Sequence, residues 1–160
     1  MKRLMVRLDK CTGCKRCEQA CMAAHSGSQN YIKAIFEQVR PQTRIFVEAS
    51  GERAVPVVCR HCVEPLCVTA CMAGCMQKDP TTGVVTNTGH EQQCVGCWMC
   101  IMSCPFGVIS AGPDGEEEGT GLFAQAIKCD FCPDRDTPAC VAACPDAAIE
   151  VAETDTEHLT

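Results

Sequence analysis

The sequence is poor in aromatic residues and in long apolar runs, and each shortage excludes a class of protein. One Trp, one Tyr and five Phe among 160 residues are too few to build an aromatic core. No run of about 18 apolar residues occurs outside the cysteine motifs, so we expect no membrane insertion. The opening residues, MKRLMVRLDK, lack both the apolar stretch of a secretory signal and a twin-arginine pair. These absences predict a cytoplasmic protein.

The sequence also lacks the motifs of nucleotide-dependent enzymes. No G-x-G-x-x-G follows a predicted strand, and no phosphate-binding loop is present. The formal net charge of −6 argues against a nucleic-acid partner, because such partners select basic surfaces. We therefore expect neither an enzyme with a substrate site of its own nor a nucleic-acid-binding protein.

What the sequence has in place of these features is cysteine, with 17 residues. Disulfides need an oxidising compartment, and an odd count leaves one thiol unpaired. Zinc sites combine two C-x2-C pairs or mix Cys with His, and the four His here have no zinc-finger spacing. Iron–sulfur clusters use Cys thiolates almost exclusively, so they are the favoured interpretation. A structural zinc scaffold is the alternative.

All but one of the cysteines fall into four groups of four. The groups are Cys11, Cys14, Cys17 and Cys21; Cys59, Cys62, Cys67 and Cys71; Cys94, Cys97, Cys100 and Cys104; and Cys129, Cys132, Cys140 and Cys144. Four such groups supply the ligands of four [4Fe–4S] clusters. Cys75 is left over. It either packs as a small hydrophobic side chain or replaces Cys71 as a ligand.

The spacing within a group has a physical reason. In C-x2-C-x2-C the backbone amides turn toward the cluster sulfurs, and we expect Gly13 and Gly96 to adopt a positive φ there. A short helix then carries the last Cys of the group away. In the bacterial run C-x2-C-x2-C-x3-C-P that last Cys ligates the other cluster of a pair. Pro105 and Pro145 follow this pattern, whereas Met stands at the equivalent position after the first two groups.

Short strands are predicted between the groups. LMVRL (4–8) and AAIEVA (147–152) alternate like strands, RIFVEASGERAVPVV (44–58) indicates a strand–turn–strand unit, and QKDPTTGVVTNT (77–88) indicates a hairpin. The expected fold class is α+β, with two bacterial-ferredoxin-like halves of short β-hairpins and helices around four [4Fe–4S] clusters. Trp98 is expected to shield a cluster from water, with an electron relay as the alternative. His61 is expected to be a surface or sulfur-facing side chain, with a ligand role as the alternative. The other histidines show no constellation.

The order of the groups resembles the four-cluster iron–sulfur subunits of the dimethyl-sulfoxide reductase, formate dehydrogenase and hydrogenase complexes. Within that set, several stretches are most similar to the iron–sulfur subunit that accompanies carbon monoxide dehydrogenase. These stretches are DKCTGCKRCEQAC, CRHCVEPLCVTACMAG, KDPTTG, CVGCWMCIMSCPFG and KCDFCPDRDTPACVAACP.

The resemblance implies that each cluster takes three thiolates from one group and one from another. The implied sets are Cys11, Cys14 and Cys17 with Cys144; Cys129, Cys132 and Cys140 with Cys21; Cys59, Cys62 and Cys67 with Cys104; and Cys94, Cys97 and Cys100 with Cys71. The chain is then a single polyferredoxin domain (1–160), with an inner half at about 52–112. An outer half combines about 1–30 with 122–152, and an acidic loop covers 112–121.

The function implied is that of a non-catalytic electron-transfer subunit. The resemblance favours carbon monoxide dehydrogenase as the catalytic partner, with a ferredoxin, flavoprotein or hydrogenase as acceptor. The nearest alternative changes the partner to a formate dehydrogenase, aldehyde oxidoreductase or hydrogenase. A redox sensor or adaptor without an electron-relay role is a further alternative.

Overall fold

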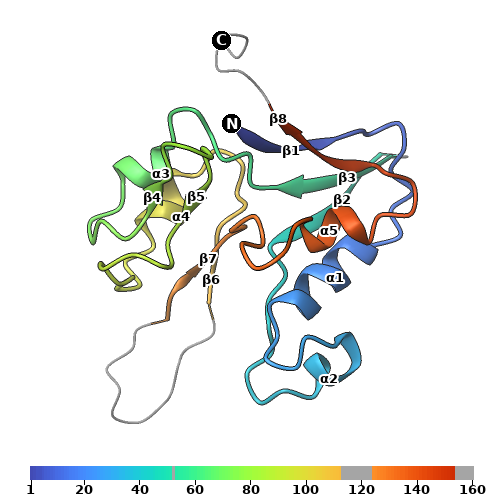
Figure 1. Ribbon diagram of the computed structural model, residues 1–160, viewed down its shortest axis with the longest axis horizontal. Helices are drawn as coiled ribbons and strands as arrows, with labels where there is room; N and C mark the ends of the chain where they lie inside the picture. Colours follow the sequence, from blue (N-terminus) through green and yellow to red (C-terminus); the bar gives the residue numbers. More distant parts are fainter. Residues whose placement is uncertain (52, 113–123, 154–160) are drawn as a thin grey trace.

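The computed structural model describes residues 1–51, 53–112 and 124–153, and these form a small α+β protein (Figure 1). Its described strands form two-stranded antiparallel sheets, and its helices are short. Within these ranges, no helix has the length and apolar character needed to cross a membrane. The predicted class of short strand pairs and short helices is therefore confirmed.

One strand pair joins the two ends of the chain. Strand β1 (Lys2–Val6) runs antiparallel to β8 (Ile149–Glu153), with Val6 opposite Ile149. Both strands were predicted from their alternating patterns, but their pairing was not. An exposed ion pair between Arg7 and Glu150, 2.9 Å long, continues the pair past its end and contributes little energy because water screens it.

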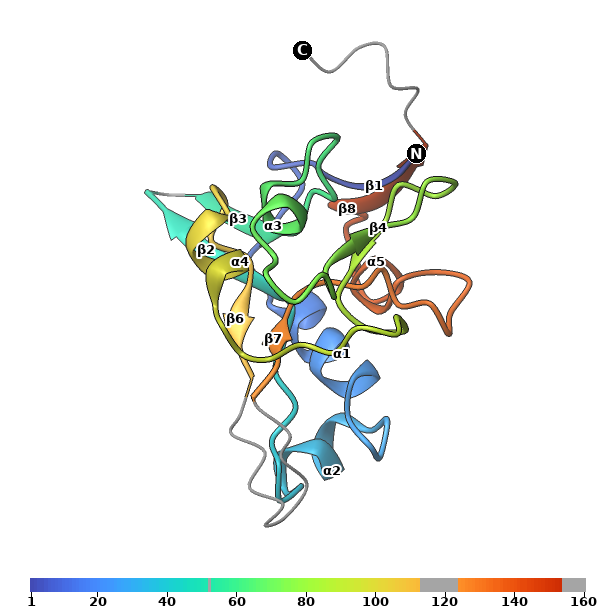
Figure 2. The ribbon, with the colours of Figure 1, turned by 90° about the vertical axis from the view of Figure 1, so that its left-hand side faces the viewer.

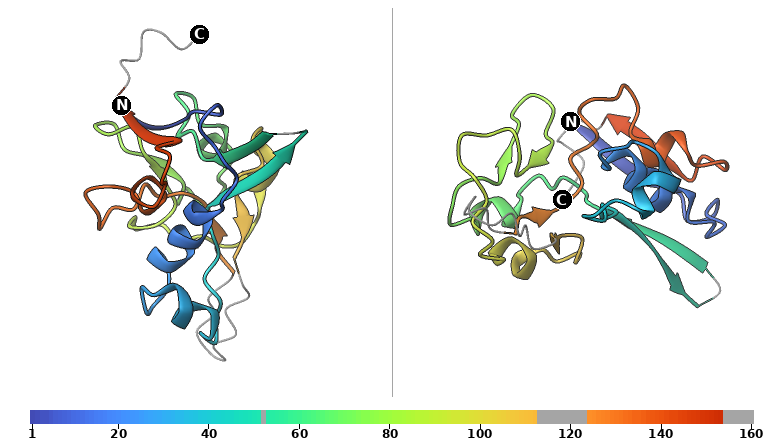
Figure 3. Two further views of the ribbon diagram at one scale, coloured as in Figure 1. Left: turned by 90° about the vertical axis from the view of Figure 1, so that its right-hand side faces the viewer. Right: turned by 90° about the horizontal axis from the view of Figure 1, so that it is seen from below.

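Two further pairs are the predicted hairpins. Strands β2 (Ile45–Ser50) and β3 (Arg53–Val58) pair along their full length, and this hairpin projects from the body in the right-hand view of Figure 3. Strands β4 (Gln77–Lys78) and β5 (Val85–Thr86) flank a turn in which the Asp79 carboxylate accepts the backbone N–H groups of two threonines. Both sequence predictions are thus confirmed.

A fourth strand pair was not predicted. Strand β6 (Ser110–Ala111) pairs with β7 (Ala126–Ile127). The acidic run predicted at 112–121 follows β6, and beyond Gly112 it lies outside the described residues. These strands are two residues long, and unlike β4 and β5 they are not joined by a short turn that would mark a hairpin in the sequence.

The helices correct one prediction. Only α1 (Arg16–Ala24) carries the last Cys of its group, Cys21. The helices of the other three groups end before that Cys: α3 (Leu66–Thr69), α4 (Met99–Ser103) and α5 (Ala139–Ala142). Cys104 shows the reason, since it is extended at φ −76° and ψ 112° and precedes Pro105, which disfavours the helical conformation before it.

Helix α2 (Tyr31–Ile35) was missed because it lies in a region without cysteine or a clear apolar period. It begins at Asn30, whose side-chain oxygen accepts the N–H groups of Ile32 and Lys33. It lies beyond the end of α1, away from the body of the molecule (Figure 2).

The elements gather into two parts that lie side by side (Figure 1). Helices α1 and α5 pack together beside the β1–β8 pair, while α3 and α4 pack together beside β4 and β5. The core is a mixture of thiols and small aliphatic side chains. Its aliphatic members are Leu4, Ile45, Val47, Val58, Met76, Val85, Val108, Ile109, Ala126 and Ile149.

Candidate metal centres

The four C-x2-C loops share one backbone feature. The residue before the second Cys of each group has a positive φ: Gly13 at 71°, His61 at 45°, Gly96 at 66° and Phe131 at 68°. The predicted conformation of Gly13 and Gly96 is confirmed. His61 and Phe131 carry side chains that disfavour this conformation, so the surrounding fold holds their loops in a strained shape. Such turns point successive backbone N–H groups inward and make a concave site for an anion.

The first cavity is lined by the thiols of Cys11, Cys14, Cys17 and Cys144. Cys144 reaches it from the far end of the chain, and its sulfur accepts the backbone N–H of Ala148 at 3.2 Å. Thr12 also donates to a carboxylate beside this segment, Asp146, at 3.0 Å. Burial raises the pKa of the Cys17 thiol to about 11, so this site favours a ligand that binds and neutralises a thiolate.

The second cavity is lined by Cys59, Cys62, Cys67 and Cys104, the first three from one group and the last from the next. His61 also lines it. Burial raises the pKa of Cys67 to about 11. The cavity therefore has the same composition as the first: three thiols from one loop and helix, and one from a distant segment.

His61 is buried in this second site at 1% exposure, so the prediction of a surface position is wrong, while a sulfur-facing ring stays a prediction. Its Nδ1 accepts the backbone N–H of Val85 at 2.9 Å, which leaves the hydrogen of the neutral ring on Nε2. Burial, assisted by the charge of Lys128, lowers the pKa of His61 to about 3. Within the described residues Nε2 has no acceptor. A bound iron–sulfur cluster fits here, because its sulfurs accept hydrogen bonds.

The third cavity is lined by five thiols, one more than the others. They belong to Cys71, Cys75, Cys94, Cys97 and Cys100. Trp98 also lines this cavity, in a position suited to the shielding role predicted for it.

The fourth set of predicted ligands is brought together by α1 and α5. Burial, and then the neighbouring thiols of Cys21 and Cys132, raise the pKa of Cys140 to about 12. Burial also raises the pKa of Cys129, which neighbours Cys140. Cys21 accepts the backbone N–H of Arg44 at 3.3 Å. Three of these four residues are buried and Cys132 is half-buried, so the set lies in a neighbourhood in which neutralisation by a metal is favourable.

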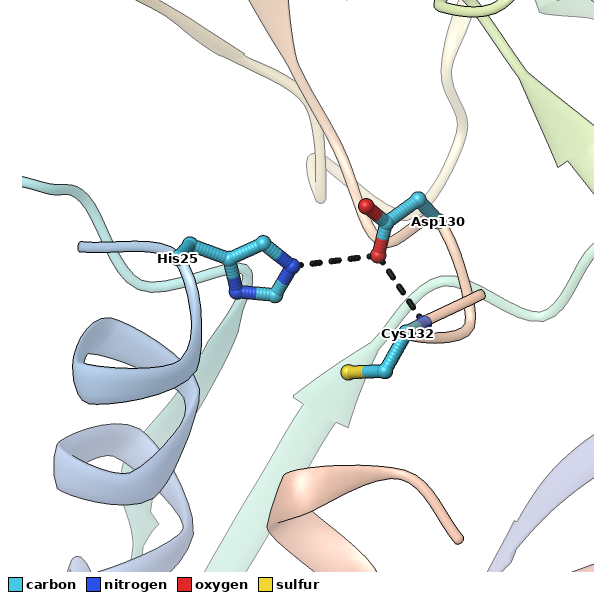
Figure 4. A group of neighbouring side chains, drawn as sticks. All are labelled: His25, Asp130 and Cys132. Carbon is cyan, nitrogen blue, oxygen red and sulfur yellow. Dashed lines mark hydrogen bonds and ion pairs between the residues drawn. The ribbon is translucent and has the colours of Figure 1, made fainter. Parts of the chain in front are cut away.

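A polar cluster beside this fourth set was missed in the sequence (Figure 4). His25 Nε2 lies 3.1 Å from Asp130 Oδ1, which also accepts the backbone N–H of Cys132 at 3.0 Å. Arg44 forms an ion pair with the same carboxylate. Burial opposes protonation of His25, but Asp130 and then the thiols of Cys132 and Cys21 raise its pKa to about 12.

These contacts make His25 and Asp130 a structural tie. His25, Asp130 and Cys132 offer atoms within 4.8 Å of one another, a spacing that also suits a metal ion. However, the Arg44 guanidinium already forms an ion pair with Asp130, so a further cation there is disfavoured. The tie fixes the end of α1 against the loop that carries Cys129 and Cys132.

Lys128 is a second feature without a signal in the sequence. Its side chain is 2% exposed, and its Nζ donates to the carbonyl oxygens of Val85 and Cys129. No carboxylate lies within ion-pair distance of it in the described ranges. A buried ammonium without an anion is costly. Its charge acts on the thiols of Cys67 and Cys129, lowering the pKa of each against the larger effect of burial.

These observations fit an anionic metal centre with four thiolate ligands. A [4Fe–4S] cluster and a zinc ion with four thiolates are both such anions, and either would supply the counter-charge for Lys128 and sulfur acceptors for His61. The thiol-lined cavities provide the ligands, and Cys makes up the whole of the predicted ligand sets.

Comparisons with known proteins give a consistent result. A family model described as "4Fe-4S dicluster domain" matches residues 52–154. An "Iron-sulfur protein" of Rhodospirillum rubrum is 36% identical over 156 residues, covering 92% of this chain and 80% of that protein. "Electron transport protein HydN" of Escherichia coli K12 is 34% identical over 148 residues, covering 88% and 81%. "NADH-dependent phenylglyoxylate dehydrogenase subunit beta" of Aromatoleum evansii is 35% identical over 141 residues, covering 88% and 28%.

Proposed function

The chain belongs to the 4Fe-4S dicluster domain family and is an iron–sulfur electron-transfer protein, and from this premise we propose that it carries four [4Fe–4S] clusters as a relay for single electrons. The observation that carries the proposal is the composition of the cavities. Each of the first two is lined by three thiols of one group and one thiol from a distant segment. That composition is what cross-ligated pairs of cubane clusters require.

We assign ligands accordingly. The proposed sets are Cys11, Cys14, Cys17 and Cys144; Cys21, Cys129, Cys132 and Cys140; Cys59, Cys62, Cys67 and Cys104; and Cys71, Cys94, Cys97 and Cys100. The lining of the first two cavities supports two of these sets, and the third cavity contains a further set together with Cys75. The remaining set, which includes Cys140, is supported by the nearness of the Cys21 and Cys132 thiols, which help to raise the pKa of Cys140.

The proposed organisation has two halves. The inner half, about 52–112, holds the second and third groups, whose helices α3 and α4 pack together. The outer half combines about 1–30 with 122–152. Its support is the β1–β8 pair and the packing of α1 on α5, which bring the first and fourth groups together.

When bound, each cluster takes up and releases one electron. The chain itself fixes the spacing between sites, because a Cys that crosses from one group to the other ties two loops to one another. It also excludes water with buried side chains such as Cys100, Cys129 and Cys140. Finally, Lys128 and the inward backbone N–H groups stabilise negative charge, which raises the reduction potential of a nearby site.

For the catalytic partner we propose carbon monoxide dehydrogenase. The support is the similarity of CRHCVEPLCVTACMAG and KCDFCPDRDTPACVAACP to its iron–sulfur subunit. A ferredoxin, flavoprotein or hydrogenase is the proposed acceptor. A catalytic partner in general is supported by the Aromatoleum evansii relative, in which a similar segment forms part of a dehydrogenase subunit. A formate dehydrogenase, aldehyde oxidoreductase or hydrogenase in that position is the alternative.

Two measurements test these proposals. The anaerobically purified chain is expected to bind about 16 iron and about 16 acid-labile sulfide. Zinc in place of iron, or about half the iron, would refute the four-cluster relay. Affinity purification of the tagged chain from its host is expected to recover carbon monoxide dehydrogenase, and recovery of only a formate dehydrogenase, aldehyde oxidoreductase or hydrogenase would refute that partner.

A further inference from the structure

The third cavity holds one thiol more than a cluster needs. Cys94, Cys97 and Cys100 come from the third group, while Cys71 and Cys75 both come from the segment after α3. The first and second cavities are each lined by four thiols and no fifth. The surplus is therefore specific to one site.

The two candidate fourth ligands touch each other. The Sγ atoms of Cys71 and Cys75 are 3.6 Å apart, a hydrogen-bond distance for sulfur. Cys75 is 2% exposed, so its thiol faces the interior, where it lines the same cavity as Cys94. Cys71 accepts the backbone N–H of Met76 at 3.4 Å. Both sulfurs thus lie beside the three thiols of the third group.

A turn, and not a helix, brings the two thiols together. A spacing of four residues would place Cys71 and Cys75 on one face of a helix, but α3 ends at Thr69. The N–H of Gly74 instead donates to the carbonyl of Cys71 at 3.2 Å, and Gly74 has a positive φ of 68°. This tight turn reverses the chain, so that both side chains line the same cavity.

Resting on the proposed cluster in this cavity, we propose that Cys75 is an alternative fourth ligand that exchanges with Cys71. In the exchange, the Cys71 thiolate gives up its bond to iron and takes a proton. Cys75 releases that proton across the 3.6 Å contact and forms the new bond to iron. No electron is transferred, and thiolate count and charge are conserved. The site therefore keeps four thiolates when either sulfur is removed.

Iron content and electron paramagnetic resonance of the anaerobically purified full chain test this exchange. Cys71→Ala is expected to retain about 16 iron, with a changed signal from one cluster because its ligand has changed. The double variant C71A/C75A is expected to lose between one and four of these iron atoms. Cys104→Ala is the matched control: it removes a crossing ligand from a cavity without a fifth thiol, so it is expected to lose iron as a single variant.

Equal iron contents in C71A and C71A/C75A would overturn the exchange, and so would iron loss in Cys75→Ala with none in C71A. If C71A does not fold, Cys71→Ser preserves the side-chain volume. Removing Cys75 from that variant must then lower the iron content, and equal values would again overturn the exchange. The unaltered chain separates the two proposals, because its own iron content of about 16 or about half tests the four-cluster relay alone.

Discussion

The buried charge of Lys128 yields the sharpest electrochemical prediction. Lys128→Met removes an ammonium that is 2% exposed and acts on the thiols of Cys67 and Cys129. Those two thiols belong to different proposed clusters. Since a reduced cluster carries one more negative charge than an oxidised one, a nearby cation stabilises the reduced state. Removing it is expected to make both reduction potentials more negative.

The size of the shift follows from Coulomb's law. If the ammonium lies about 8 Å from the centre of a cluster, the interaction at an effective dielectric constant of about 20 would be about 2 kcal/mol. For a one-electron couple about 1.4 kcal/mol corresponds to about 59 mV, so the expected shift is about −90 mV. Met also leaves the carbonyls of Val85 and Cys129 without this donor, at a cost of about 1–3 kcal/mol each in the free energy of unfolding.

Two control variants separate charge from hydrogen bonding. Lys128→Gln removes the charge but keeps N–H donors, so it should shift the potentials with a smaller loss of stability. Lys78→Met is the matched control. Lys78 also donates to a backbone carbonyl, that of Val63, but it lies at the surface, where water and salt screen its charge, so its removal should leave the potentials unchanged. Redox titration followed by electron paramagnetic resonance measures the potentials. If Lys128→Gln left all of them within about 20 mV of the unaltered protein, the electrostatic reasoning would be refuted.

Other outcomes follow from the site. Cys104→Ala should disrupt the cluster of the second group and spare that of its own group, and an intact second-group signal would contradict cross-ligation. His25→Gln and Asp130→Asn should each speed the loss of one cluster in the presence of a chelator, because each variant weakens the contact between α1 and the loop that carries Cys129 and Cys132. Unchanged rates of cluster loss would refute that structural role. Complete removal of iron should abolish most tertiary structure by near-ultraviolet circular dichroism, since the ligands hold a thin core together, and a retained native spectrum would contradict this.

Much of the architecture follows from local patterns in the sequence. The β2–β3 and β4–β5 hairpins were predicted because their alternation and turn residues act over a few positions. Gly13 and Gly96 were predicted to have a positive φ because the C-x2-C loop demands it. The same demand at His61 and Phe131 was not recognised, since no small residue marks those positions.

The features that were missed depend on contacts between distant segments. His25 and Asp130 are separated by 105 positions, and although Asp130 lies inside the fourth C-x2-C loop, nothing in the sequence links it to His25. Lys128 stands in AIKCD, where an isolated lysine normally indicates a surface; only the approach of β5 buries it. The end of α4 was misplaced because Pro105 disfavours the helical conformation at Cys104, so that this helix stops one residue before that Cys. No proline follows Cys71, and the early end of α3 has no such local cause.

The pairing of β1 with β8 determines when a newly synthesised chain can be completed. Strand β1 and the first cysteine group are made before the second and third groups, but β1 gains its partner only when residues 149–153 have been made. The second and third groups lie between them and meet earlier in synthesis. Iron is thus expected to bind first at the second and third groups and later at the first and fourth. A truncation that removes β8 should leave the thiols of the first group without the β1–β8 pair that brings them close to the fourth group.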